Sequence, residues 1–154
     1  MWDGRVVSIH LAAEASAPMQ TVTEARALPG RGLEGDRYFS GTGFYSKKAS
    51  TGGREVTLIE TEAVEALEDG LKLSAADSRR NIATAGVPLN HLVNREFYVG
   101  SVRMRGVRLC EPCQHLDGLT QTGVMSGLVH RGGLRAQILT EGVIRAGDVV
   151  RPAD

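Results

Sequence analysis

Apolar and polar residues alternate along much of the chain, and this alternation predicts a protein built mainly from short strands. Residues 4–10 (GRVVSIH) predict a first strand with Val6, Ser8 and His10 on one face, because successive side chains of a strand point to opposite faces. The run Glu55–Ile59 is rich in β-branched residues and predicts another strand. Both segments therefore indicate a sheet.

The rest of the chain extends this prediction. Further strands are expected at residues 21–27, 97–99, 102–109, 134–140, 142–148 and 149–150. Short helices are expected at residues 62–68 after a capping Thr61, at 74–77 through a capping box, and at 88–93. Gly106 interrupts the alternation as a β-bulge would, and the glycine-rich residues 30–53 indicate a loop. Short strands separated by glycines, with two or three small helices, point to a closed or nearly closed β-barrel.

Composition narrows the possible partners. The chain has 154 residues, which suits one domain, and its 18 basic residues balance 18 acidic ones. Zero net charge argues against a general nucleic-acid binder or a polybasic membrane-surface protein. The charges are segregated, however: residues 1–77 hold 8 basic and 12 acidic side chains, and residues 78–154 hold 10 and 6. Every basic residue of the second half is Arg, whose fork of donors suits phosphates and carboxylates.

The sequence shows no targeting or membrane signal. Its first residues lack the charged start and apolar core of a signal peptide, and no stretch approaches the ~20 apolar residues that span a bilayer. Two cysteines, Cys110 and Cys113, are too few for a disulfide scaffold. A cytoplasmic protein is therefore expected.

Three segments combine glycine with charged groups suited to anion binding. In residues 32–38 (GLEGDRY), glycines free the backbone N–H groups to approach an anion, and Asp36 stands beside Arg37. Residues 78–81 (SRRN) place two arginines directly after a predicted helical turn. Residues 130–136 (HRGGLRA) open a strand, with Arg131 and Arg135 on one face. The alternatives are, in turn, a glycine-rich turn with a surface ion pair, a solvated turn, and a β-turn with a basic rim.

The segment around the two cysteines allows three chemistries. Cys110 and Cys113 form a Cys-x-x-Cys pair that could be a redox dithiol, although the helix that usually follows such a pair is not predicted. Cys110, Cys113, His115 and His130 could instead bind zinc in a metal-stabilised binding module. Finally, Cys113 alone could be a reactive thiolate whose pKa nearby arginines lower, with Cys110 as a small buried residue. Spacing alone leaves these three open.

Taken in order, these segments resemble the MOSC domain, the module found at the C-terminus of molybdenum-cofactor sulfurases and as small stand-alone bacterial proteins. The matching stretches are residues 32–38 (family pattern G-[LV]-x-G-D-R-[HY]), 79–81 (RRN), 112–113 (PC), 130–133 (HRGG) and 142–150 (GVIRAGDVV). The resemblance implies a mainly β fold, a MOSC-type β-barrel with a few short helices that forms a single domain over residues 1–154.

The resemblance also implies a role with the molybdenum cofactor or with sulfur; the parent sulfurases are further associated with pyridoxal phosphate. The resemblance implies that Cys113 is the thiol that ligates molybdenum or receives sulfur. His115 or His130 would orient or deprotonate it, and His130 is the histidine expected at the catalytic site. The reaction would be sulfur transfer, reduction of N-hydroxylated bases or C–S bond cleavage, served by a sulfur or electron donor protein. The residues expected to line a pocket for an anionic pterin-type cofactor or a sulfur-containing substrate are Asp36, Arg37, Arg79, Arg80, Asn81, Arg131, Gly132 and Arg135.

Overall fold

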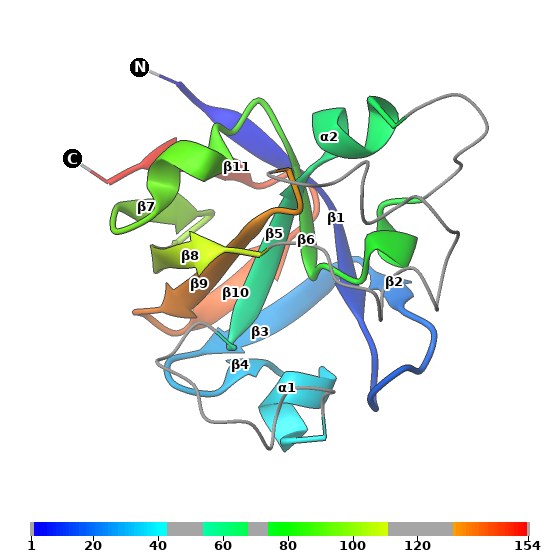
Figure 1. Ribbon diagram of the computed structural model, residues 1–154. Helices are drawn as coiled ribbons and strands as arrows, with labels where there is room; N and C mark the ends of the chain where they lie inside the picture. Colours follow the sequence, from blue (N-terminus) through cyan, green and yellow to red (C-terminus); the bar gives the residue numbers. More distant parts are fainter. Residues whose placement is uncertain (1, 43–53, 68–73, 111–130, 154) are drawn as a thin grey trace.

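The computed structural model describes residues 2–42, 54–67, 74–110 and 131–153, and the chain is mainly β in these ranges (Figure 1). The helical elements are short: α1 (Arg37–Ser40), α2 (Thr61–Glu65) and the 3₁₀ turns η1 (Ala76–Ser78) and η2 (Leu89–Leu92). The strands are β1 (Gly4–Leu11), β2 (Gln20–Val22), β3 (Glu24–Leu28), β4 (Gly32–Leu33), β5 (Val56–Glu60), β6 (Ile82–Ala85), β7 (Glu96–Val99), β8 (Val102–Leu109), β9 (Leu134–Ile138), β10 (Gly142–Arg145) and β11 (Val149–Pro152).

Seven of the described strands close into a barrel in the order β11-β7-β8-β9-β5-β6-β1. The ring closes where β1 pairs with β11, with Gly4 opposite Val150, so the first and last strands lie side by side (Figure 1). Neighbouring strands are antiparallel except β5 and β6, which run parallel with Leu58 opposite Ile82. Closure leaves these strands without an open edge. The predicted MOSC-type β-barrel with a few short helices is confirmed.

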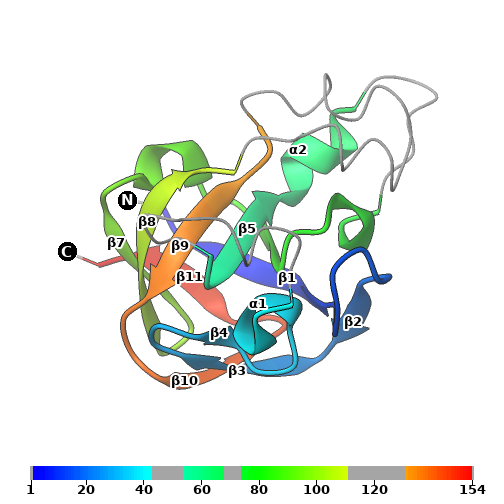
Figure 2. The same cartoon turned by 60° about the horizontal axis from the view of Figure 1, so that its bottom comes forward.

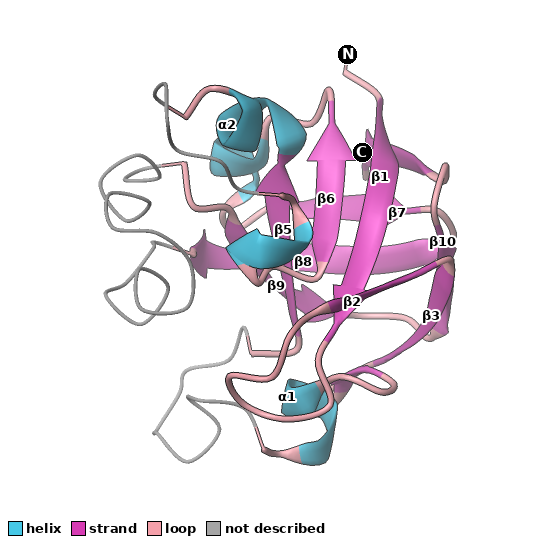
Figure 3. Cartoon of the chain, turned by 90° about the vertical axis from the view of Figure 1, so that its right-hand side faces the viewer, coloured by secondary structure: helices cyan, strands magenta, loops and turns pink. Residues whose placement is uncertain are grey.

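A second sheet, β10-β3-β4, packs against the barrel (Figure 2). Its inward residues Ala27, Leu33 and Ile144 are buried in the same apolar cluster as barrel residues such as Phe97 and Met104. One continuous core therefore holds both sheets together. Outside the barrel, α2 follows β5 directly (Figure 3). Ala63 of α2 packs with Ile59 and Ala83 in a smaller cluster. None of the described helices is both long and apolar enough to span a bilayer.

The first strand forms as predicted, but its faces do not alternate regularly. Val6 and Ile9 are both buried in the core, whereas Val7 is 49% exposed. The reason is a register shift between β1 and β6: Val6 lies opposite Thr84 and Ser8 lies opposite Ala83, so Val7 is an extra residue. Ser8 and His10 share a face as predicted, since the Ser8 hydroxyl lies 2.8 Å from His10 Nε2. The prediction that Val6 belongs to the same face was wrong, because the bulge between Val6 and Ser8 reverses the faces of the residues after it.

Other predicted elements differ mainly at their boundaries. The strand expected at 21–27 is divided into β2 and β3, and the expected loop 30–53 contains β4 and α1. The capping box is confirmed: the Asp77 N–H donates to Ser74 Oγ (3.1 Å), and the Ser74 N–H donates to Asp77 Oδ2 (3.4 Å). Thr61 was a wrong choice of cap, because the cap position of α2 is Glu60 and the Thr61 hydroxyl instead donates to the Thr84 carbonyl.

Candidate functional site

The fold brings three of the predicted segments together beside α1 and η1. The Arg37 Nη2 donates to the Arg79 carbonyl (3.2 Å), and the Arg80 Nε donates to the Gly132 carbonyl (2.8 Å). Arg79 and Arg80 lie between η1 and β6, and Gly132 directly precedes β9. Because β1 and β6 are adjacent in the barrel, His10 near the end of β1 lies in the same group (Figure 3).

Asp36 and Arg37 form a buried ion pair at the start of α1. Asp36 is 1% exposed, and its Oδ1 accepts hydrogen bonds from Arg37 Nη1 (3.0 Å) and from the Ala12 N–H (3.2 Å). Its Oδ2 accepts the Tyr38 N–H, which caps the helix. Both carboxylate oxygens are therefore engaged, and Asp36 acts here by holding Arg37 and α1 in place. The alternative interpretation of residues 32–38, a glycine-rich turn with a surface ion pair, is wrong because the ion pair is buried.

Arg79 has an incompletely satisfied guanidinium. Its Nη1 donates to the Ala17 carbonyl (2.5 Å), whereas its Nη2 is buried and has no hydrogen-bond partner among the described residues. Burial and the neighbouring Arg37 charge lower the pKa of Arg79. Arg79 is therefore a positive charge that is partly removed from water and that lies near the positive charge of Arg37. An anion bound beside Arg79 would stabilise this arrangement.

Arg80 connects β6 to both ends of the segment that carries Cys113. Its Nη2 donates to the Cys110 carbonyl (2.9 Å), its Nε to the Gly132 carbonyl (2.8 Å), and its Nη1 to the Ser78 carbonyl (3.1 Å). The Cys110 N–H also donates to the Gly133 carbonyl (2.7 Å). Residues 110 and 132 are therefore fixed to one buried guanidinium, which we call the Arg80 clamp.

Asn81 joins three strands and has little capacity left for a ligand. Its Oδ1 accepts hydrogen bonds from the Thr57 N–H (3.1 Å) and the Thr57 hydroxyl (3.2 Å), and its Nδ2 donates to the His10 carbonyl (3.1 Å). Asn81 is 2% exposed. Its side chain therefore fixes β1 and β5 relative to the start of β6, and it supports the site rather than contacting solvent.

The two remaining arginines lie in different surroundings. Arg131 is exposed, and its charge lowers the pKa values of Glu60 and Glu62, although burial raises the pKa of Glu60 overall. Arg135 lies opposite Arg108 in the β8–β9 pair. Burial, Arg135 and Arg54 together lower the pKa of Arg108. The structure thus brings the charges of Arg37 and Arg79 together. The Arg80 side chain is instead bound to three backbone carbonyls, and Arg135 belongs to a second group of arginines near Cys110.

The thiol chemistry is only partly within the described residues. Cys110 directly follows β8 and is a free, buried cysteine. Its backbone N–H and its carbonyl are both hydrogen-bonded. Cys113, His115 and His130 lie outside the described residues. Within the described part of the chain, no group of three His, Cys, Asp or Glu side chains is arranged to hold a metal ion.

The sequence reasoning missed a buried histidine in this site. The His10 Nδ1–H donates to the Arg80 carbonyl (3.0 Å), so Nε2 carries a lone pair and accepts a hydrogen bond from the Ser8 hydroxyl (2.8 Å). His10 is 1% exposed. The only sequence signal was a histidine within an otherwise apolar strand, and its partner is 70 residues away.

We expect this histidine to make stability dependent on pH. Burial lowers the pKa of His10 below 6.5, by more than its hydrogen bond to the Arg80 carbonyl raises it. The unfolded chain therefore binds a proton that the folded protein excludes, so stability present above pH 6.5 is lost as the pH falls through the folded-state pKa. Urea unfolding should show a loss of at most ~1.4 kcal/mol per pH unit from this group.

His10→Gln should flatten this pH dependence, while His91→Gln, at an exposed histidine, should leave it unchanged. A wild-type protein that becomes more stable as the pH falls from about 6.5 to about 5 would contradict this role of His10.

The fold and the site together define a class: a closed β-barrel with buried arginines at the ends of its strands. Comparison with known families agrees with this class. The family described as "MOSC domain" matches the chain over residues 33–151, which is more than half of its length. The chain belongs to the MOSC domain family. Among curated proteins, none matches its sequence.

Solved structures share the fold at low sequence identity. The YuaD protein from Bacillus subtilis superposes with a TM-score of 0.78 at 15% identity, covering 100% of both chains. YiiM from Geobacillus stearothermophilus has a TM-score of 0.74 at 14% identity, covering 98% of this chain and 75% of its own. YiiM from Escherichia coli has a TM-score of 0.66 at 16% identity, covering 100% and 70%. At these identities the likeness establishes the fold alone.

Proposed function

We propose that this protein is a MOSC-type enzyme that binds an anionic pterin-type cofactor or substrate beside Arg37, Arg79 and Arg80, and that Cys113 is its reactive thiol. The reaction classes that fit are sulfur transfer, reduction of N-hydroxylated bases and C–S bond cleavage. The observation that carries the proposal is the buried Nη2 of Arg79, which has no hydrogen-bond partner among the described residues; Arg79 adjoins Arg80 in sequence, whose side chain binds the Cys110 carbonyl.

Charge balance supports an anionic ligand at this place. The guanidinium groups of Arg37 and Arg79 are close enough for their charges to interact, and among the described residues Asp36 is the acidic group that forms an ion pair with Arg37. Burying an uncompensated charge is costly, so a phosphate or carboxylate near Arg79 would lower the energy of the site. Arg80 donates to three carbonyls, which leaves Arg79 as the better candidate for direct contact.

Covalent geometry supports the role of Cys113. A residue three positions beyond Cys110 can be at most about 11 Å from it, and the Cys110 carbonyl is itself bound to Arg80. The same reasoning keeps His130 near Gly132. An arginine within ~4–6 Å of the Cys113 thiol would lower its pKa, which favours both nucleophilic attack and binding to a soft metal.

The residues present fit a molybdenum cofactor in chemical type. Arg79 would bind its anionic phosphate, and the Cys113 thiolate would be a soft ligand for the metal. When bound, the cofactor would supply two-electron redox chemistry. Asp36, Asn81 and Arg80 contribute by holding Arg37, the strand ends and the Cys113 segment in position. Arg131 and Arg135 would extend the basic surroundings.

Metal and pterin analysis tests the proposal. Protein produced with cofactor available should retain molybdenum and pterin, and Cys113→Ala should abolish sulfur-transfer or reductase activity. Cys110→Ala is the matched control: it removes a buried thiol whose neighbours bind its backbone, so it should cost about 1–2 kcal/mol of stability and leave activity in the folded protein. Arg79→Met should reduce pterin retention, because the anion loses its donor.

The outcomes separate the alternatives. Equal damage from Cys110→Ala and Cys113→Ala would favour a Cys-x-x-Cys redox protein. One zinc per chain, with unfolding on chelation, would favour the zinc-stabilised module with Cys110, Cys113, His115 and His130 as ligands. Absence of molybdenum and pterin, with every activity unchanged in Cys113→Ala, would refute the catalytic proposal.

A further inference from the structure

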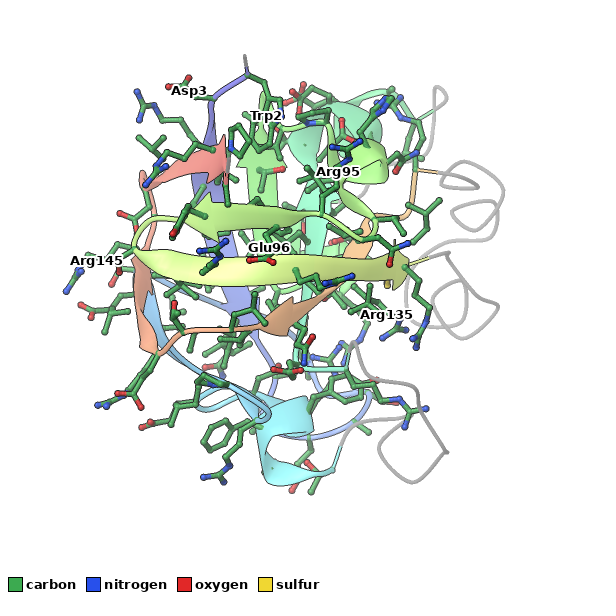
Figure 4. All side chains as sticks on the ribbon, turned by 90° about the vertical axis from the view of Figure 1, so that its left-hand side faces the viewer. Trp2, Asp3, Arg95, Glu96, Arg135 and Arg145 are labelled. Atoms are coloured by element: carbon green, nitrogen blue, oxygen red, sulfur yellow. The ribbon has the colours of Figure 1, made fainter. Side chains whose placement is uncertain are left out.

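A separate cleft lies on the outer face of β7 and β8, where Trp2, η2 and the end of β11 meet. Its volume is about 640 Å³, within the usual range of ~300–1,000 Å³ for sites that bind small molecules. Trp2, Arg95 and Glu96 are seen on this face in Figure 4, and Arg145 lies at its far edge. None of the residues proposed above for the cofactor site lines this cleft.

The walls of the cleft combine apolar surface with positive charge. Trp2, which is partly buried against the core, and Leu92, which is almost completely buried, are apolar residues that line the cleft. Arg103 is neutralised by an ion pair with Glu96. Arg95 and His91, in contrast, are exposed, and no hydrogen bond or ion pair of their side chains is found within residues 54–67, 74–110 and the other described ranges. The cleft is thus lined by an exposed guanidinium and by an indole ring.

The backbone under Arg95 is rigidly held. The Asn94 N–H donates to the Gly106 carbonyl (2.8 Å), and the Gly106 N–H donates to the Arg95 carbonyl (2.9 Å). The turn approaches β8 so closely that a Cβ on Gly106 would lie 2.0 Å from the Leu92 carbonyl oxygen. Gly106 therefore permits both hydrogen bonds, and the backbone of Arg95 is fixed before any ligand arrives, so that binding has to order only the Arg95 side chain.

We propose that this cleft is a ligand site for a planar aromatic anion, meaning a ring that carries a carboxylate or a phosphate. The Arg95 fork would bind the oxyanion in a bidentate way. The Trp2 indole would stack on the ring, which requires a flat and apolar ligand body. The Glu96–Arg103 pair bounds the cleft and disfavours a second negative group near Glu96. This ligand is independent of the cofactor proposed for Cys113.

Matched probe pairs test the charge and ring requirements. Adenosine 5′-monophosphate is compared with adenosine, and benzoate with benzamide, because each pair differs in its anionic group. Trp2 is the only tryptophan of the chain, so its fluorescence reports binding in the cleft, and calorimetry provides the affinity. We expect at least one anion to bind ~10-fold or more tightly than its neutral partner, and the pair that does so identifies the anionic group as phosphate or carboxylate.

Variants assign the binding to the cleft. Arg95→Ala should weaken the anion at least ~10-fold, and Trp2→Leu should weaken it by calorimetry. Arg145→Ala is the matched control. Arg145 is an exposed arginine outside the cleft, and its Nη2 lies 4.0 Å from Glu24 Oε2. Cys113→Ala should bind the probes as the wild type does, whatever its activity. Failure of both anions to bind, or equal losses in Arg95→Ala and Arg145→Ala, would overturn the proposal.

Discussion

Gly133→Ala should prevent folding or lower the free energy of unfolding by more than ~3 kcal/mol. Gly133 has φ +106°, which residues with a side chain rarely adopt, and a Cβ there would lie 1.9 Å from the Leu58 carbonyl oxygen. The obstruction is backbone of β5, so no side chain can rotate away to relieve it. The strands β5 and β9 would have to separate, although their pairing is part of the closed barrel. Urea unfolding followed by circular dichroism measures the effect.

Gly30→Ala is the matched control for this prediction. Gly30 also has a positive φ of +76°, but a Cβ there would have no atom within 4 Å. Only the conformational cost should remain, about 1 kcal/mol. A Gly133→Ala protein as stable as Gly30→Ala would show that β5 and β9 do not approach one another as closely as described. The comparison thus separates crowding from backbone conformation.

Arg80→Met should lower the free energy of unfolding by about 3–5 kcal/mol and abolish activity in the protein that remains folded. Three buried carbonyls, those of Ser78, Cys110 and Gly132, lose their donor, and each unpaired group costs ~1–3 kcal/mol. Activity should suffer separately, because both ends of the segment that carries Cys113 would be released. Urea unfolding and an activity assay below the unfolding transition measure the two effects.

Two further variants sharpen the test of the clamp. Arg80→Lys keeps the charge but cannot reach three carbonyls in three directions, so its stability should lie between the wild type and Arg80→Met. Arg151→Ala removes an exposed arginine over the Tyr98 ring and should change stability by less than ~1 kcal/mol. If Arg80→Met retained both full stability and full activity, the clamp would have no role.

The strands were predictable because their periodicity is local. The pattern of 102–109 revealed β8 and even its bulge, since Gly106 breaks the alternation where the β8–β9 register shifts. The bulge in β1 gave no such signal. Val7 and Ser8 are ordinary strand residues, and the extra residue is apparent only from the register with β6. Periodicity within one strand cannot reveal the register in which the neighbouring strand pairs with it.

The sequence predicted which residues lie at the site better than it predicted what their side chains contact. Motifs identified Arg79, Arg80 and Asn81, and the structure does bring Arg79 together with Arg37. Their partners, however, are mostly backbone carbonyls far along the chain: Arg80 binds a carbonyl 52 residues away, and Asn81 binds one 71 residues away. No short-range pattern encodes such partners. His10 was missed for the same reason.

The Arg80 clamp also bears on how this barrel could diversify. Because the carbonyls of residues 110 and 132 bind the same guanidinium, the chain between them leaves and re-enters the barrel at a single anchored junction. Insertions or deletions within that stretch would change loop-closure entropy only slowly, by ~0.6 kcal/mol per doubling of length. They would leave the pairing of β8 with β9 untouched. The stretch that carries Cys113 can therefore be lengthened, shortened or exchanged while the barrel strands stay the same.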